Sequence, residues 1–359
     1  MPLRTSIAAA IVLALPKAAN AQEGGKWTVY GQLSFGALTV ENGGGDETFF
    51  AENGHIPSRI GATFAVPHDH GAGLAFNVET GFGLSDLSEA APKQRGPDID
   101  LDRTALRKFE AIYSSPSIGV FSAGQGSMAS DGAAGVDLSG TSFAHGPAIG
   151  DLGGGVAFLD LNGEASGVFV GDVFDDLDGP RRFRVRYDAP EWNGLTASVA
   201  VGREVLREGD DRVFRDIAVA YARATDLFEA EAKVSYEWAG DDAEILLASA
   251  SALHKPTGLN LTVVAGGNLV GVGDYLYVKL GLRREVFPAG RTAIALEYYD
   301  GDDLGFVGSD ARAYGIGLAQ IIDDASVEIV GALRRYELSA RGRAFQNIDV
   351  AMIGARWRF

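Results

Sequence analysis

The stretch that decides the fold is "IDVAMIGARWRF", residues 348–359. Every second residue back from Phe359 is apolar, and this side also carries Trp357. The other side carries Arg356 and Arg358. An alternation with a period of two indicates a β-strand with one apolar and one polar face. A strand between a soluble core and water would show the same alternation, so the neighbouring sequence must separate these alternatives.

The same alternation recurs along the chain, for example in "KWTVYGQLSFGALT" (26–39), "RRFRVRYD" (181–188) and "FEAEAKVSYEW" (228–238). These segments run for about 9–12 residues, which is the length of a tilted membrane strand. Strands in soluble proteins average about 5–6 residues. A soluble secreted β-protein, the alternative, therefore fits the segment lengths less well.

Short and long connections alternate between these segments. "PHDHGA", "PEWNG" and "KPTG" are short, whereas "ENGGGDETFFAENGHIP" (41–57) and "DGDDLGFVGSD" (300–310) are long, acidic and glycine-rich. Short turns on one rim and long loops on the other are the plan of an outer-membrane barrel, which has an even number of strands. The sequence predicts an all-β fold, a 16-stranded antiparallel transmembrane β-barrel that occupies residues 22–359. Its strands are expected to start near residues 26, 58, 72, 105, 118, 181, 195, 212, 228, 243, 259, 272, 291, 310, 325 and 348.

The first 21 residues read as a signal peptide. Arg4 precedes an apolar run over residues 7–15, and small residues at 19–21 match a cleavage site after Ala21. The apolar run is shorter than the roughly 20 residues of a membrane-spanning helix. The chain has no cysteine and a formal charge of −17, so it predicts no disulfide framework and no nucleic-acid partner.

Four stretches carry a resemblance to a known family: "VYGQLSFGA" (29–37), "PSRIGATFAVPHDHGAGLAFNVETGFG" (57–83), "RKFEAIYSSPSIGVFSAGQGS" (107–127) and "RVRYDAPEWNGLTASVAVG" (184–202). In order and spacing, the chain resembles the general diffusion porins of Gram-negative outer membranes, especially the alphaproteobacterial kind. The resemblance implies a homotrimer among outer-membrane lipids, each barrel a water-filled channel for passive diffusion of small hydrophilic solutes and ions. It implies no catalysis, and it makes Phe359 the terminal aromatic that the barrel-assembly machinery reads.

The resemblance also implies a constriction of the channel. The segment 128–180 is the longest irregular stretch, and it is expected to fold inward with a hairpin near residues 155–161 and 166–173. Acidic residues of this loop are then expected to face arginines of the wall. The wall candidates are Arg59, Arg107, Arg182, Arg184, Arg186 and Arg356, and the loop candidates are Asp131, Asp137 and Asp151.

The register at Arg107 stays open. The family motif turns Arg107 inward, whereas the opposite register turns Lys108 and Glu110 inward. Alternation gives the direction of Arg182, Arg184 and Arg186 more firmly, because an arginine facing lipid near the bilayer midplane costs about 2–4 kcal/mol. Because the acidic residues concentrate in the long loops, we expect a mild preference for cations.

Weaker signals suggest other functions. Oxygen ligands in "DVFDDLDGP" (172–180) could bind Ca²⁺, but the spacing is not that of an EF-hand, and a solvated acidic loop is the alternative. Apart from this possible Ca²⁺, no cofactor is expected. A channel selective for sugars or anions would need a ladder of lumenal side chains. A membrane-embedded hydrolase would need a nucleophile that a base activates. Ser142 and His145 are the candidate pair, but the sequence around Ser142 lacks a nucleophile-elbow motif. The metal candidates are Asp172, Asp175, Asp176 and Asp178, and the ladder candidates are Tyr275, Tyr277, Lys279 and Arg283.

Overall fold

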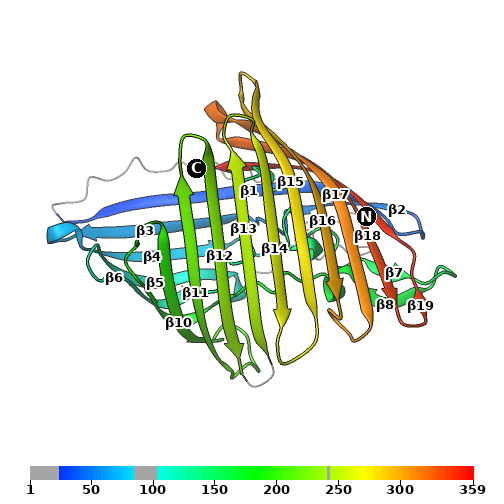
Figure 1. Cartoon of the computed structure of the whole chain (residues 1–359), viewed down its shortest axis with the longest axis horizontal. Helices are drawn as coiled ribbons and strands as arrows, with labels where there is room; N and C mark the ends of the chain where they lie inside the picture. Colours follow the sequence, from blue (N-terminus) through cyan, green and yellow to red (C-terminus); the bar gives the residue numbers. More distant parts are fainter. Residues whose placement is uncertain (1–23, 85–102, 241–242) are drawn as a thin grey trace, which may run out of the picture.

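The computed structural model describes residues 24–84, 103–240 and 243–359 of the chain. The expected signal peptide, residues 1–21, lies outside the described residues. Sixteen antiparallel strands form a closed barrel, which confirms the fold class expected from the sequence (Figure 1). Each of these strands begins within two residues of its expected start. They are β1 (Lys26–Glu41), β3 (Arg59–Pro67), β4 (Gly73–Gly81), β5 (Leu106–Ser115), β6 (Gly119–Ser127), β9 (Arg181–Asp188), β10 (Leu195–Arg203), β11 (Val213–Ala224), β12 (Phe228–Ala239), β13 (Glu244–His254), β14 (Leu259–Asn268), β15 (Asp274–Phe287), β16 (Gly290–Asp302), β17 (Ser309–Ile322), β18 (Val327–Ala340) and β20 (Ile348–Arg358).

The barrel closes where its first strand meets its last. β1 pairs with β20 from the position where Gln32 lies opposite Arg358 to the end of β1. Gly31 and Phe359 extend this ladder with two backbone hydrogen bonds of 3.0 and 3.1 Å. Closure matters because the bilayer core offers no water to pair with the polar groups of a free sheet edge.

Side chains alternate between the outside and the inside of the barrel. On β15, Leu276 and Leu280 are exposed on the outer surface, while Tyr277 and Lys279 are buried inside. On β9, Val185 is exposed and its neighbour Arg184 is buried. Exposed apolar side chains on many strands give the outer surface the character that contact with lipid requires.

The segment 41–57, which the sequence predicts to be a loop, contains a further strand, β2 (Asp46–Glu52). β3 pairs with the first half of β1, and β2 pairs with its second half. Phe49 of β2 is buried inside the barrel and Phe50 is exposed. The prediction of a loop was wrong for this part. Phe49 and Phe50 lie on opposite faces of a strand, one inside the barrel and one outside.

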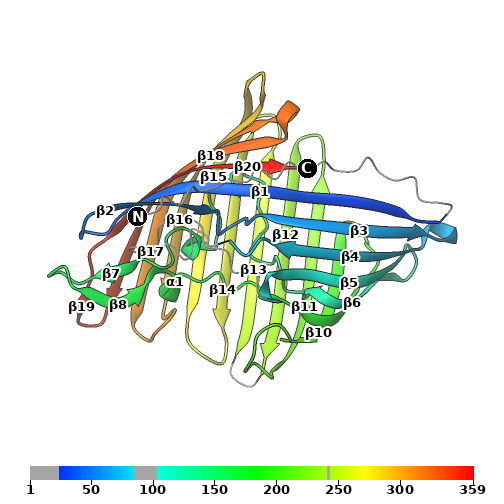
Figure 2. The ribbon, with the colours of Figure 1, turned by 180° about the vertical axis from the view of Figure 1, so that it is seen from behind.

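Most of the longest connection, residues 128–180, lies within the barrel, while the tip of its hairpin, residues 161–165, is exposed. It contains the expected hairpin, β7 (Ala157–Leu159) and β8 (Ala165–Phe169), and then the single helical turn α1 (Val170–Val173). Figure 2 shows this hairpin near β19 (Arg343–Ala344), where Asp160 forms a bridge with Phe345. Apolar side chains of the connection pack against the inner wall formed by β1, β13 to β18 and β20; they include Phe143, Ile149, Leu152, Phe158, Val173 and Phe174.

The remaining helical elements are short. In the described ranges, 3-10 turns occur at Asp69–Gly71, Arg103–Ala105, Ile149–Asp151 and Asp323–Ala325. Within the same ranges, no helix has the length and apolar character needed to cross a membrane.

Candidate functional site

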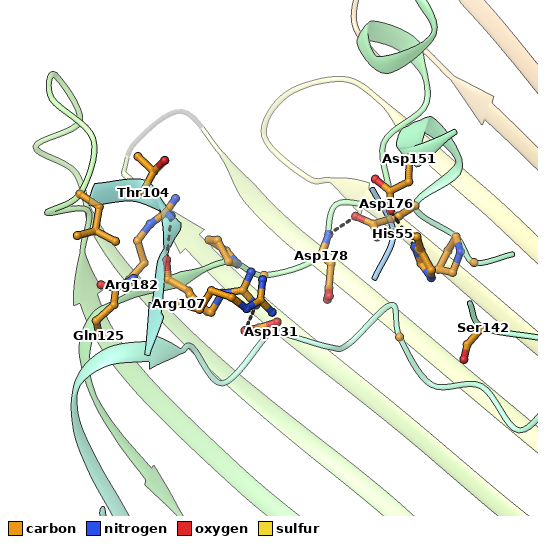
Figure 3. A pocket seen from close by; sticks show the side chains of 18 of the residues that line it. His55, Thr104, Arg107, Gln125, Asp131, Ser142, Asp151, Asp176, Asp178 and Arg182 are labelled. Atoms are coloured by element: carbon orange, nitrogen blue, oxygen red, sulfur yellow. Dashed lines mark hydrogen bonds and ion pairs between the residues drawn. The ribbon is translucent and has the colours of Figure 1, made fainter. Parts of the chain in front are cut away.

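The buried connection leaves a polar cavity between itself and the wall formed by β5, β6 and β9. The cavity has a volume of about 490 Å³. Figure 3 shows Arg107 and Arg182 on one side, Asp151, Asp176 and His55 on the other, and Asp131 and Asp178 between them. The titratable side chains that line the cavity are His55, Arg107, Asp131, Asp137, His145, Asp151, Asp176, Asp178, Arg181, Arg182, Glu204 and Arg207.

Three wall arginines share two carboxylates. Arg107 Nε donates a 2.7 Å hydrogen bond to Glu79 Oε1, and Arg59 Nε lies 3.8 Å from the same oxygen. Arg181 has its terminal nitrogen 3.8 Å from Asp131 Oδ2. Arg59 also interacts electrostatically with both other arginines. Of these three arginines, Arg107 and Arg181 line the cavity, and Arg59 is not part of its lining.

A β-bulge resolves the register at Arg107. Glu79 pairs with Lys108, the next residue Thr80 pairs with Leu106, and Arg107 is the extra residue between them. Lys108 therefore shares the inward face of Glu79, while the bulge turns Arg107 to the same carboxylate. Both alternatives that the sequence left open hold in part, because a bulge breaks the period of two.

Arg182, Arg184 and Arg186 all point inward, as the alternation predicts, but only Arg182 lines the cavity. Arg182 donates a 3.0 Å hydrogen bond to Glu204 Oε2. Arg184 forms an ion pair with Glu110 and donates to the carbonyl oxygens of Gly124 and Ser127. These three partners hold Arg184 at the base of the inward loop.

Arg186 and Arg356 are also held away from the cavity lining. Arg186 pairs with Asp188 at 2.7 Å and donates to Met128 O at 2.7 Å. Arg356 forms an ion pair with Glu328 and lies over the ring of Phe143 of the inward loop. A paired arginine contributes less to the field in the channel than one with a distant counter-charge. Arg186 and Arg356 contact the inward loop, whereas Arg107, Arg181 and Arg182 line the cavity.

Asp131 and Asp151 lie on the loop side of the cavity, as expected. The Asp131 carboxylate faces Arg181, and its backbone oxygen accepts a 2.7 Å hydrogen bond from Lys233 Nζ. Asp151 Oδ2 lies 2.8 Å from Nδ1 of His55. His55 belongs to the connection between β2 and β3.

Asp137, the third expected loop acid, borders the cavity but forms a buried ion pair. Lys279 Nζ of β15 donates to Asp137 Oδ2 at 2.8 Å and to His145 O at 2.8 Å. Burial opposes ionisation of Asp137, but Lys279 and the hydrogen bonds from Ser139 outweigh it and lower the pKa of this carboxyl. Asp137 is therefore ionised and neutralised by its partner, and it fastens the loop to the wall.

Asp176 and Asp178, which the sequence suggested as metal ligands, lie on the acidic side of the cavity. Asp178 accepts hydrogen bonds from the backbone N–H groups of Gly132 and Ala134 at 2.9 and 3.0 Å. Burial and the neighbouring Asp178 raise the pKa of Asp176 well above its ordinary value. Burial also raises the pKa of Asp178. The proximity of Asp178 therefore adds to the effect of burial in disfavouring the ionised form of Asp176.

The other two metal candidates satisfy backbone groups. Asp172 Oδ2 accepts a 2.9 Å hydrogen bond from the N–H of Phe169 at the start of α1, and Asp175 Oδ1 accepts one of 2.8 Å from Leu177. In the part of the chain that the structure describes, no three acidic, histidine or cysteine side chains are placed to hold a metal ion together. The acidic segment acts there as a set of turn-stabilising acceptors.

The candidate ladder on β15 faces inward, but the loop covers most of it. Tyr275 donates a 2.6 Å hydrogen bond to Asp176 O, and Tyr277 donates one of 2.9 Å to Glu297 Oε2. Arg283 is less buried and lies 3.6 Å from Glu229. Tyr275, Lys279 and Arg283 each donate a hydrogen bond to the loop, with Leu138 O as the acceptor for Arg283 at 3.4 Å. Tyr277 is held by β16 instead, so the four side chains do not form a row along an open channel.

His145 is buried beside the wall. Its Nε2 lies 3.3 Å from Glu297 Oε1, and burial lowers the pKa of this imidazole to about 3. Among the described residues, no hydrogen bond joins His145 to Ser142. The contacts of His145 are those of a neutral side chain enclosed by the loop and β16.

Four titratable residues of the cavity lining were missed from the sequence: His55, Arg181, Glu204 and Arg207. Arg181 is the first residue of β9, and the alternation of this strand would place it on the apolar face. At this terminal position its side chain instead turns toward Asp131. His55 lies in a connection with no motif of its own. The order Gly-His-Ile-Pro, residues 54–57, shows only that the strand is interrupted there.

Comparisons with known proteins agree with this geometry. A family model described as Gram-negative porin matches residues 8–340. The chain is similar in fold to the anion-selective porin from Comamonas acidovorans, with 14% identity, a TM-score of 0.59 and coverage of 93% of this chain and 100% of that one. It is similar to outer-membrane expressed OmpT of Vibrio cholerae, with 12% identity, a TM-score of 0.60 and coverage of 96% and 100%.

A variant of the Rh. blastica porin is 18% identical, with a TM-score of 0.52 and coverage of 93% of this chain and 100% of that one. OmpT of Vibrio cholerae is also known in a trimer form. A comparison with curated proteins found no match. The family match covers most of the chain, and the closed barrel with its buried loop fits it. The chain therefore belongs to the Gram-negative porin family and forms a non-enzymatic channel of the outer membrane.

Proposed function

We propose that this porin is a general diffusion pore whose narrowest part is the cavity between Arg107 and Arg181 on one side and the loop carboxylates on the other. The observation that carries the proposal is the opposed placement of these charges across a polar cavity. A field across the pore orders water and penalises the passage of apolar solutes, so small hydrophilic solutes and ions are the expected cargo.

We further propose a mild preference for cations. The cavity is lined by Asp131, Asp151, Asp176 and Asp178 in addition to the neutralised Asp137. The formal charge of the whole chain is −17, and an acidic channel mouth concentrates cations. The wall arginines oppose this effect, which keeps the preference weak.

The remaining proposals extend the family assignment. The exposed apolar outer surface supports assembly of three copies, as in the trimer form of OmpT. The ordered motifs in β1, β3 to β6, β9 and β10 support a relationship to the alphaproteobacterial kind of porin. Phe359, which pairs with Gly31 at the closure, is the proposed contact for the barrel-assembly machinery. Residues 1–21 are the proposed signal peptide.

Planar-bilayer recording tests the proposed function. Detergent-purified protein is added to one side of a lipid bilayer in salt, and conductance is followed over time. Stepwise ohmic increases that close in threes at high voltage are the result we expect from a trimeric pore. A silent bilayer after verified insertion would contradict an open channel.

A further inference from the structure

His55 occupies an unusual place on the acidic side of the cavity. It comes from the connection between β2 and β3, whereas the surrounding acids come from the inward loop. Its Nδ1 lies 2.8 Å from Asp151 Oδ2, and about a fifth of its side chain is exposed, 21%. The contact is therefore open to the cavity, as Figure 3 shows.

The structure holds the His55 ring in this place. Gln32 Nε2 donates a 2.8 Å hydrogen bond to Pro57 O and fixes the segment that carries His55. Asn53 Oδ1 accepts a 2.9 Å hydrogen bond from Ile56 N within the same segment. The ring lies against Gly146 of the loop, where an added Cβ would come within 2.4 Å of the ring Cε1.

We propose that His55 is a selectivity-determining residue that makes the ion preference of the pore depend on pH. The proposal rests on the proposed diffusion function. An imidazole is the side chain that ordinarily gains a proton between pH 8 and pH 5. Protonation places a positive charge 2.8 Å from Asp151 and cancels one negative charge of the acidic side. The wall arginines keep their charge over this range, so the preference for cations falls in acid.

Other titratable groups surround the His55 imidazole. The inward loop contributes Asp151, Asp176 and His145, and the segment of His55 contributes Glu52, whose carboxylate accepts a hydrogen bond from Ser58 N. His145 has a pKa near 3 and stays neutral from pH 8 to pH 5. Asp176 has a raised pKa and is the competing source of a change in charge.

The test is the reversal potential of single channels in a salt gradient at pH 8 and at pH 5. For the natural protein we expect the cation-to-anion permeability ratio to fall about twofold, because a unit charge at about 8 Å in water changes local ion concentration by roughly that factor. His55→Gln is expected to show, at both pH values, the permeability ratio that the natural protein has at pH 8. His55→Lys is expected to show, at both pH values, the ratio that the natural protein has at pH 5. His68→Gln, in a turn on the opposite rim, is the matched control and is expected to behave like the natural protein.

Each of the following outcomes supports or overturns the role proposed for His55. Loss of the shift in His55→Gln together with its retention in His68→Gln supports the inference. A shift that survives in His55→Gln and disappears in Asp176→Asn assigns the effect to the acidic loop and overturns it. A conducting channel with no shift between the two pH values also overturns it. A silent bilayer at both pH values counts against the pore itself, which separates the two failures.

Discussion

At the scale of residues, the same side-chain type serves two purposes inside this barrel. Lys279 and Arg184 are buried and paired: Lys279 holds the inward loop through Asp137, and Arg184 joins β9 to Glu110 of β5. Arg107 and Arg181 face the cavity, where charge acts on what passes. Burial separates the two groups, because Arg107 lies as close to Glu79 as Lys279 does to Asp137. A buried pair is costly to break because removing one partner leaves an uncompensated charge.

The Lys279–Asp137 pair gives the first prediction. Lys279→Met should destabilise the loop by about 3–5 kcal/mol, the cost of a buried carboxylate left without its partner. The measurement is the free energy of loop opening, from hydrogen exchange of the loop amides. Adding Asp137→Leu should recover most of the loss, since both charges are then gone. If the single and double variants opened equally, the ion pair would not be what fastens the loop.

The pH dependence of loop stability gives the second prediction. A carboxyl whose pKa is lowered by folding stabilises the loop above its ordinary pKa of 3.8, and Asp137 loses this contribution in acid. Asp176 has a raised pKa, so its contribution has the opposite sign: it is greatest below 3.8 and declines as the pH rises toward the raised value.

Asp176→Asn should therefore stabilise the closed loop at neutral pH and leave it almost unchanged near pH 3. Protease cleavage of the loop at the two pH values measures this difference. An Asn keeps the oxygen that accepts the hydrogen bond from Asp178 N, which makes the change mainly one of charge. Faster cleavage of the variant at neutral pH would refute the assignment.

At the scale of elements, the strands were predictable and their irregularities were not. The period of two is a property of each strand alone, so it gave the starts of β1, β9 and β20. β2 escaped notice because Phe49 and Phe50 are adjacent and apolar, which masks alternation. The bulge at Arg107 escaped notice because it depends on how β4 and β5 are paired.

The same limit applied to the site. Asp131 and Asp151 could be named because the loop itself could be recognised. His55 could not be named, since its contact joins residues 96 positions apart. Arg184 and Arg186 were placed on the correct face, but their carboxylate and backbone partners come from the folded loop and wall. The periodicity of a sequence shows on which face of a strand a residue lies, whereas the contact partners of that residue follow only from the folded structure.

The outer surface of β10 gives the third prediction. Val199 is exposed, 47%, in the middle of this strand. Val199→Arg should lower the folding free energy in lipid by about 2–4 kcal/mol, because it places a charge in hydrocarbon. Urea unfolding in lipid vesicles measures the change, and Val199→Leu serves as the control. An unchanged folding free energy for Val199→Arg would mean that this face does not meet the bilayer interior.

At the scale of the whole molecule, the interior is divided by the inward loop. On the side of β13 to β18 the loop and wall form an apolar core beneath a set of buried ion pairs. On the side of β5, β6 and β9 they leave the polar cavity. The rigid attachment on one side fixes the position of the loop acids on the other. A pore of constant width follows from this division.

The central claim is that the charges on opposite sides of the cavity set the ion preference of the pore. The reversal potential in a salt gradient at pH 8 tests it most directly, in the natural protein and in two variants that each remove one charge. The account predicts mild cation preference, strengthened by Arg181→Gln and weakened by Asp178→Asn. Anion preference in the natural protein, or shifts of the same sign in both variants, would contradict it.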